Sequence, residues 1–324
     1  MSKKVLLSGI KPTGNLHVAN YFGAMKQFVD LQDEYDTYIS IVNYHAMTTV
    51  HNGELLKKLT FEAVVDHLAI GLDPEKATLF VQSDIEGLTE LTWIFNTLIT
   101  VPYLERAHAY KDKIAKGIEP SVALFDYPVL MASDILAMNP DVIPVGEDQR
   151  QHIEIAREIA RKFNNQYGEI FGEPKEMIME NVAVVPGIDG EKMSKSYGNT
   201  IPLFATDEEI RSQVAKIVTD STPVGEAVDV EKDNVFALHK LFSADILDEL
   251  KNRYEKGDIG HKESKDILAE NIIKFVTPFR NKREELMNNP DYVHEVLEKG
   301  AEKANKKVKE VLEKVREVTG IKYK

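Results

Sequence analysis

Residues 4–24 read KVLLSGIKPTGNLHVANYFGA, and this stretch decides the fold. Its first part, KVLLS (4–8), is a short apolar run of the kind that forms a buried β-strand. A turn of small residues follows, contains His17 and Asn20, and leads into a segment that can begin a helix. A strand that turns into a helix in this way opens a β–α–β unit, and a nucleotide's phosphates can bind at the turn. The alternative is an ordinary strand-to-helix turn, since Ala19 stands where such loops usually have Gly.

Four further β-rich runs punctuate the first two hundred residues. They are TYISIVN (37–43), ATLFVQS (77–83), DVIPVG (141–146) and NVAVVPG (181–187). Helical patterns separate them, and the clearest one runs through residues 55–68 and ends at Gly71. Alternating strands and helices predict an α/β fold with a mostly parallel sheet and helices on both faces.

The loops that follow the strands should carry the chemistry, because ligands of parallel sheets bind beyond the carboxyl ends of the strands. The loops in question follow Ser8, Asn43, Gly146 and Gly187.

Beyond about residue 200 the strand pattern ends. TDEEIRSQVAKIV (206–218) begins with a capping box, Thr206 with Glu209 three positions later, and the following segments keep a helical period. We therefore expect two domains, an α/β domain over residues 1–200 and a smaller all-helical domain over residues 201–324.

Composition narrows the class of protein. A chain of 324 residues with 43% hydrophobic and 29% charged residues is typical of a soluble globular protein. The net charge of −13 argues against a general nucleic-acid coating protein but permits a site that contacts a few phosphates. No apolar run is long enough to span a membrane and no signal peptide is recognisable, so we expect a cytoplasmic protein without a membrane partner. The absence of cysteine excludes disulfides, thiolate metal sites and a cysteine nucleophile.

EKMSKSYGN (191–199) is the second unusual stretch. Two lysines three positions apart, with serines between and after them, form a short loop that bears movable ammonium groups. Such a pair suits a triphosphate whose charge shifts during a reaction. A solvent-exposed basic loop is the alternative.

Together, the H-x-A-N of the first loop and the KMSKS of residues 192–196 resemble the two signatures of class I aminoacyl-tRNA synthetases. Four segments also look like parts of the tryptophanyl-tRNA synthetases: SGIKPTGNLH (8–17), YPVLMASDIL (127–136), PVGEDQRQHIEIAR (144–157) and EKGAEKANKKV (298–308). The resemblance covers nearly the whole chain. It implies a Rossmann-like sheet and a homodimer. The implied reaction activates L-tryptophan with ATP and Mg²⁺ to tryptophanyl-adenylate, then transfers tryptophan to tRNA(Trp) for translation. The first domain would then be catalytic, and the second would bind the tRNA near its anticodon.

The resemblance also implies nucleotide contacts from the first loop, from the turn after the fourth strand and from the KMSKS segment. The implied ATP-binding residues are Lys11, Pro12, Thr13, Ala19, Asn20, Gly146, Glu147, Asp148, Lys192, Met193, Ser194, Lys195 and Ser196. Catalytic contacts to the phosphates would come from Lys192, Lys195, His17 and Lys113. The family often has Gln in place of Lys11 and Gly in place of Ala19, and a solvated surface is an equal alternative for Lys113.

For tryptophan, the resemblance assigns the indole N–H to Asp134, with Met131 and Val145 beside the ring. Indole has a single polar group, a donor, so an apolar pocket with one acceptor suits it. Tyr127 and Gln149 would contact the ammonium and carboxylate end, and His45 would line the pocket. The alternatives are a helix cap for Asp134, core packing for Tyr127, a helix-surface amide for Gln149 and a structural hydrogen bond for His45. No metal-ligating side chains are expected.

Three other functions compete with this interpretation. A tyrosyl-tRNA synthetase shares the architecture, but it usually has Gln where Met131 stands. A small nucleotidylyltransferase would not need the helical domain. A non-catalytic paralogue would have no reason to keep both Lys192 and Lys195, although Ala19 slightly favours it. A dinucleotide-dependent dehydrogenase is disfavoured, because no G-x-G-x-x-G follows the first strand.

Overall fold

The structure is a computed structural model, and it describes residues 3–14, 16–107, 110–111, 119–146, 149–178, 185–220, 222–223 and 225–323. Three of the expected site residues, Lys113, Glu147 and Asp148, lie outside these ranges.

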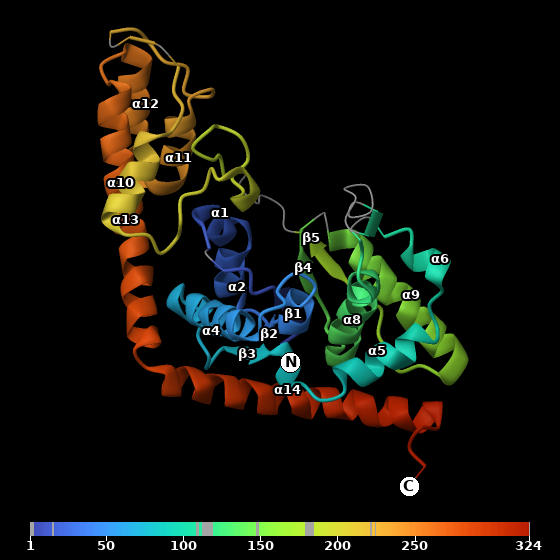
Figure 1. The fold of residues 1–324 in the computed structure, drawn as a ribbon. Coiled ribbons are helices and arrows are strands. Elements are labelled where there is room, and N and C mark those ends of the chain that lie inside the picture. The colour runs from blue at the N-terminus through green and yellow to red at the C-terminus, as the bar shows by residue number, and fades with distance from the viewer. Residues whose placement is uncertain are drawn as a thin grey trace.

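Parallel strands form the centre of the N-terminal part (Figure 1). The strands are β1 (Val5–Ile10), β2 (Asp36–Ile41), β3 (Ala77–Val81), β4 (Ile143–Val145) and β5 (Glu176–Ile178). β2 pairs in parallel with β1 and with β3, and β4 pairs in parallel with β5. A parallel bridge between Leu6 and Val142 joins the two groups next to β1. The resulting order is β3-β2-β1-β4-β5. Strands β2 and β3 are added on one side of β1, and β4 and β5 on the other, as in a Rossmann-like sheet, so the predicted α/β fold is confirmed.

The fifth strand that the structure describes is β5 (Glu176–Ile178), which precedes the run at residues 181–187 where we expected a strand. Residues 179–184 lie outside the described part of the chain, and Pro186 forms only an isolated bridge with Lys192. The three residues of β5 are too few to show a strand period of their own, and their pairing with β4 defines them.

Both faces of the sheet are covered by helices. Tyr38 and Phe80 pack on one face against residues of the later helices, and Ile39 and Leu79 pack on the other against the first helices. Successive side chains of a strand alternate between faces, so burial on both faces explains why these strands are continuous apolar runs. The helices of this part are α1 (Val18–Asn20), α2 (Lys26–Leu31), α3 (Asn43–Ala46), α4 (Gly53–Ala69), α5 (Leu88–Asn96), α6 (Val101–Leu104), α8 (Val122–Met138) and α9 (Arg150–Tyr167). Short turns of other helix types are η1 (Tyr21–Met25), η2 (Gln82–Asp84) and η4 (Lys195–Tyr197).

The later elements that the structure describes are helical. They are α10 (Asp207–Ala215), α11 (Asn234–Phe242), the short η5 (Ala244–Ile246), α12 (Leu247–Lys256), α13 (His261–Met287) and α14 (Pro290–Thr319). The predicted capping box starts α10: Glu209 N donates to Thr206 Oγ1 at 3.2 Å, and Thr206 N donates to Glu209 Oε2 at 2.8 Å. In Figure 1, α10, α11, α12 and the first part of α13 form a separate group beside the sheet.

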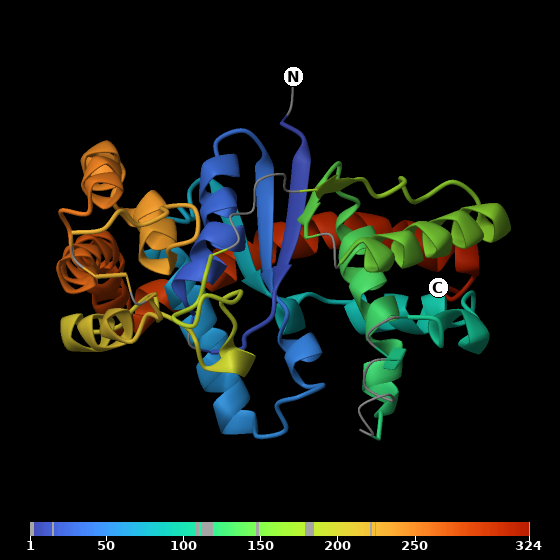
Figure 2. The same cartoon turned by 90° about the horizontal axis from the view of Figure 1, so that it is seen from above.

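The last helix, α14, leaves this group and runs across the sheet (Figures 1 and 2). Its apolar stripe is buried and consists of Val293, Val296, Ala304, Val308, Leu312 and Val315. Gly300 lies so close to β3 that an added Cβ would stand 1.9 Å from the carbonyl oxygen of Leu79. Only glycine fits there, so α14 packs directly on the strand backbone. None of the helices formed by the described residues is both long and apolar enough to cross a membrane.

Candidate active site

The expected site residues gather where the parallel strands end. Lys11 follows β1, His45 lies just after β2, and Gly146 follows β4. Gln82 is in the same position after β3. These carboxyl ends point to one side of the molecule in Figure 2, where the KMSKS segment and the first turns of α8 also lie.

The two signature segments meet at this edge. Lys195 Nζ donates to the carbonyl oxygen of Gly14, a residue 181 positions earlier in the chain, and lies 3.4 Å from Thr13 Oγ1. The chain after KMSKS also pairs with the first loop, since Val18 N donates to Ile201 O at 3.0 Å. Partial burial lowers the pKa of Lys195, and the charge of Asp66 opposes that shift. A cationic side chain is therefore held against the loop that was expected to bind phosphates.

Within the KMSKS segment the side chains divide between core and surface. Met193 is buried and packs in the same core cluster as Ile201, whereas Lys192 and Lys195 are on the exposed side. Ser194 Oγ accepts a hydrogen bond from Ser196 N at 3.3 Å and thereby caps η4. Met193 anchors the segment, so any nucleotide contact from this residue would have to come from its backbone.

His17 begins the first helix as a neutral side chain. Its backbone N donates to Asn20 Oδ1 at 3.0 Å, and its Nδ1 has no hydrogen-bond partner among the described residues. Burial, and to a smaller extent the charge of Lys195, lowers the pKa of His17 to about 4. At pH 7 the imidazole is therefore uncharged and can offer one N–H to a phosphate oxygen. Ala19 is half-buried and packs on the neighbouring core cluster.

Tyr127, Met131 and Asp134 lie on one face of α8, because they are four and three positions apart. The carboxylate of Asp134 accepts hydrogen bonds from His45 Nε2 at 3.1 Å and from Gln82 Nε2, which lies 2.8 Å from both of its oxygens. Asp134 is inside α8, whose N-cap is Ser121, so the alternative of a helix cap is wrong.

The sequence analysis missed Gln82. This side chain is fully buried, and its Oε1 accepts a hydrogen bond from Tyr44 N at 3.0 Å while its Nε2 holds Asp134. One pattern could have revealed it: Gln82 is the first residue after the buried strand β3, on the edge where the other loops were expected to carry the chemistry.

His152 is a second residue that the sequence analysis missed. Its Nε2 lies 2.5 Å from the hydroxyl of Tyr127. Burial raises the pKa of Tyr127 to about 12, so the phenol stays protonated. The ring of His45 stands edge-on to that of Tyr127, with 6.0 Å between the centroids. His45, Tyr127 and Asp134 thus form one group, as their expected roles require.

The remaining expected residues lie around this group. Val145 is buried at the end of β4, Met131 packs against the same core cluster, and Gln149 is the N-cap position of α9. Lys11 Nζ donates to Thr48 Oγ1 at 3.2 Å, and Thr48 Oγ1 donates to the carbonyl oxygen of His45 at 2.8 Å. This link joins the first loop to the group around Asp134. Where the chain is described, no three His, Asp or Glu side chains come together as metal ligands.

Residues 2–289 match the family described as tRNA synthetases class I (W and Y). The chain belongs to this family. The resemblance seen in the two signature segments is thereby confirmed.

Individual relatives are similar over nearly the full length. A tryptophan–tRNA ligase from Fusobacterium nucleatum is 49% identical over 317 residues, which are 97% of this chain and 97% of the relative. A tryptophanyl-tRNA synthetase from Campylobacter jejuni, crystallised with ADP and tryptophan, superimposes with a TM-score of 0.94 at 45% identity, covering 98% of this chain and 99% of that one. A tyrosyl-tRNA synthetase from Archaeoglobus fulgidus, covering 87% of this chain and 90% of that one, has a TM-score of 0.65 at 19% identity and shares the fold alone.

Proposed function

We propose that this chain is a tryptophan–tRNA ligase that activates L-tryptophan with ATP and transfers it to tRNA(Trp). The observation that carries the proposal is the contact of Lys195 with Gly14, which brings the two signature segments together at the carboxyl ends of the strands. The identity of 49% to a tryptophan–tRNA ligase over almost the whole chain supports the choice of amino acid.

In the first step the carboxylate oxygen of tryptophan attacks the α-phosphorus of ATP, and pyrophosphate leaves with the electrons of the broken P–O bond. The enzyme has to align the two substrates and stabilise the charge on the phosphates. Lys195 and Lys192 supply positive charge to the leaving pyrophosphate, and the neutral His17 donates a hydrogen bond to a phosphate oxygen. In the second step a ribose hydroxyl of the tRNA end attacks the activated carbonyl, and AMP leaves.

Tryptophan recognition depends on Asp134. With His45 and Gln82 as donors on one side, the carboxylate keeps free lone pairs for the indole N–H. Met131 and Val145 offer apolar contact to the ring, and the Tyr127 hydroxyl and Gln149 contact the ammonium and carboxylate end. A tyrosine substrate would place a phenol, which both donates and accepts, beside the apolar Met131.

Mg²⁺ would accompany ATP. At nucleotide sites Mg²⁺ is usually held mainly by phosphate oxygens and water, so the ion would arrive with the substrate. Gly146 lies at the end of β4, where its lack of a side chain lets the ribose approach the backbone, and Glu147 and Asp148 would accept hydrogen bonds from the ribose hydroxyls. Lys113 would reach the pyrophosphate.

The domain assignment follows from these roles. Residues 1–200 would bind ATP and tryptophan, and the helical residues 201–324 would bind the tRNA near its anticodon, with α14 as a helix that also braces the sheet. Because phosphate contacts release counterions, tRNA affinity should fall as salt rises even though the chain is acidic. Since translation takes place in the cytoplasm, we expect the protein to act there.

A homodimer is part of the same proposal. Three large apolar side chains are exposed on neighbouring helices, Trp93 of α5 at 75%, Val101 of α6 at 59% and Val122 of α8 at 81%. Large exposed apolar side chains are candidates for an interaction site, and a second copy of the chain is the partner that the family implies. Trp93 is the single tryptophan of the sequence, so its fluorescence should shift to longer wavelength if dilution separates the copies.

Exchange of labelled pyrophosphate into ATP tests the proposed reaction. With each of the twenty amino acids in turn, exchange should depend on tryptophan and on Mg²⁺. Exchange driven by tyrosine and not by tryptophan would refute the specificity, and no exchange with any amino acid would refute the enzymatic function.

A further inference from the structure

The KMSKS segment is closed by the side chain of one buried asparagine. Asn199 is 2% exposed, and its amide bonds to both halves of the segment. Its Oδ1 accepts from Ser194 N at 2.8 Å, and its Nδ2 donates to Asp189 Oδ1 at 2.8 Å and to the carbonyl oxygen of Lys192 at 3.2 Å. One side chain therefore fixes the backbone on both sides of Met193.

The side chain of Asn199 is closely packed by its neighbours. A Cβ added to Gly187 would stand 2.3 Å from Asn199 Nδ2, so the glycine is what makes room for the amide. The backbone of Asn199 takes part as well, since its carbonyl oxygen accepts from Ile188 N at 3.0 Å. The base of the loop and the amide are thus packed as one unit.

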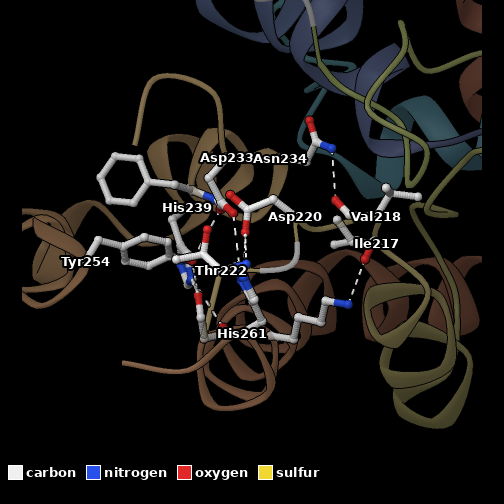
Figure 3. Close-up of polar contacts among 12 residues, drawn as sticks. Ile217, Val218, Asp220, Thr222, Asp233, Asn234, His239, Tyr254 and His261 are labelled. Atoms are coloured by element: carbon white, nitrogen blue, oxygen red, sulfur yellow. Dashed lines mark hydrogen bonds and ion pairs between the residues drawn. The ribbon is translucent and has the colours of Figure 1, made fainter. Parts of the chain in front are cut away.

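This unit is attached to the helical part of the chain. Val218 N donates to Ile188 O at 2.7 Å. Val218 O accepts from Asn234 Nδ2 at 2.9 Å, a bond that Figure 3 shows. The next residue towards the N-terminus, Asp233, is buried at the start of α11 and lies 3.3 Å from the hydroxyl of Tyr254. The frame that holds the loop is therefore itself anchored in the core of the helical group.

We propose that Asn199 is a positioning residue for the activation step and holds Lys192 and Lys195 where the pyrophosphate leaves. The inference rests on the proposed function, because that function gives the two lysines their role at the leaving pyrophosphate. Asn199 is buried beneath the loop, and its side chain acts on the lysines through the backbone of the KMSKS segment. The carbonyl of Lys192 and the N–H of Ser194 flank the buried Met193, so losing the amide frees the backbone between the two cationic side chains.

Asn199→Ala tests the proposal, with Asn164→Ala as the matched control. Asn164 also braces a turn, through its bonds to Ile170 N at 3.0 Å and to Phe171 N at 3.1 Å. It lies near the C-terminal end of α9, whereas the site residues Gln149 and His152 lie at the start of that helix. Asn199→Ala should lower kcat for tryptophan-dependent pyrophosphate exchange by about 10–100-fold, because small displacements of catalytic groups cost this much, while KM for tryptophan changes by less than about twofold. Asn164→Ala should change neither constant.

Two further variants separate positioning from general stability. In a Lys195→Ala background, Asn199→Ala should lower kcat by a smaller factor than it does in the wild type, since one of the two lysines that it positions is gone. Asn199→Asp should be as impaired as Asn199→Ala, because it sets a carboxylate against Asp189, and adding Asp189→Asn should restore part of kcat. Full additivity with Lys195→Ala, or a kcat of Asn199→Ala equal to that of Asn164→Ala, would overturn the proposal.

Trypsin cleavage gives a readout that does not need activity. Asn199→Ala should be cleaved after Lys192 or Lys195 about tenfold faster than the wild type and Asn164→Ala, because local opening exposes the loop. If the wild type shows no exchange, the proposed function fails, and this cleavage rate still decides whether Asn199 holds the loop. Equal rates in the three proteins would show that it does not.

Discussion

Gln82→Glu is the substitution that tests tryptophan recognition most directly. Gln82 is fully buried, and its Nε2 lies 2.8 Å from each oxygen of Asp134. Glutamate has almost the same shape and keeps an oxygen to accept from Tyr44 N, so the fold around the side chain is preserved. The substitution removes the hydrogen-bond donor to Asp134, because a carboxylate oxygen replaces the amide NH₂ group that faces it.

The expected loss follows from the bond that is removed. A hydrogen bond to a charged group contributes about 1.5–3 kcal/mol. Its loss would leave Asp134 held by His45 alone and facing a second negative charge. We therefore expect KM for tryptophan at pH 8 to rise by about 10–150-fold, the factor that corresponds to this free energy, while KM for ATP stays within about twofold. Two adjacent carboxylates share a proton, so the pKa of one is raised.

The assay is tryptophan-dependent pyrophosphate exchange as a function of pH. As the pH falls from about 8 to about 6, the protonated Glu can donate to Asp134 again, and KM should return towards that of the wild type. Gln32→Glu is the control, because Gln32 is also buried and bonds Gly71 O at 3.2 Å, away from the site. An unchanged KM at pH 8, or an equal rise in the control, would show that Gln82 does not orient Asp134.

The other predictions concern phosphate chemistry, pH dependence and the first loop. Lys192→Ala and Lys195→Ala should each lower kcat for adenylate formation by about 100–1000-fold with little change in KM for tryptophan, and wild-type kcat in both would make KMSKS a mere surface loop. Burial lowers the pKa of His67 to about 4 from 6.5, so unfolding takes up a proton between these values and stability falls as the pH falls through this window. Each such histidine contributes about 1.4 kcal/mol per pH unit to the slope of the unfolding free energy against pH. When urea unfolding is measured between about pH 7 and 5, His67→Leu should take up about one proton fewer on unfolding than the wild type. An unchanged slope would contradict the assignment. Ala19→Gly should keep activity and lower KM for ATP, although a helical glycine costs about 0.5–1 kcal/mol of stability, and a raised KM would mean that the methyl group packs favourably.

Local patterns predicted the elements well. The first four strands, the capping box at Thr206 and the shared face of Tyr127 and Asp134 all depend on residues close together in the chain. The resemblance to known signatures added the family, which the comparisons confirm. The individual roles of the site residues stay predictions.

Long-range contacts could not be predicted in the same way. Gln82 and His152 are recognisable as site residues only from their contacts with Asp134 and Tyr127. The packing of α8 against its neighbours brings these side chains together. The place of α14 is a similar case. Its helical period was visible, but the period of a helix says nothing about which surface its apolar stripe covers.

The close packing of Gly300 on β3 has a consequence for folding during synthesis. The strand is completed at residue 81, whereas the helix that covers it extends from Pro290 to Thr319. Domains usually fold from the N-terminus as the chain emerges, but strand β3, at the edge of the sheet, lacks the helix that packs on its backbone until almost the whole chain has been made. Throughout that interval Tyr38 and Phe80 lack the apolar cover that α14 provides, so the nascent chain should bind chaperones up to the release of α14.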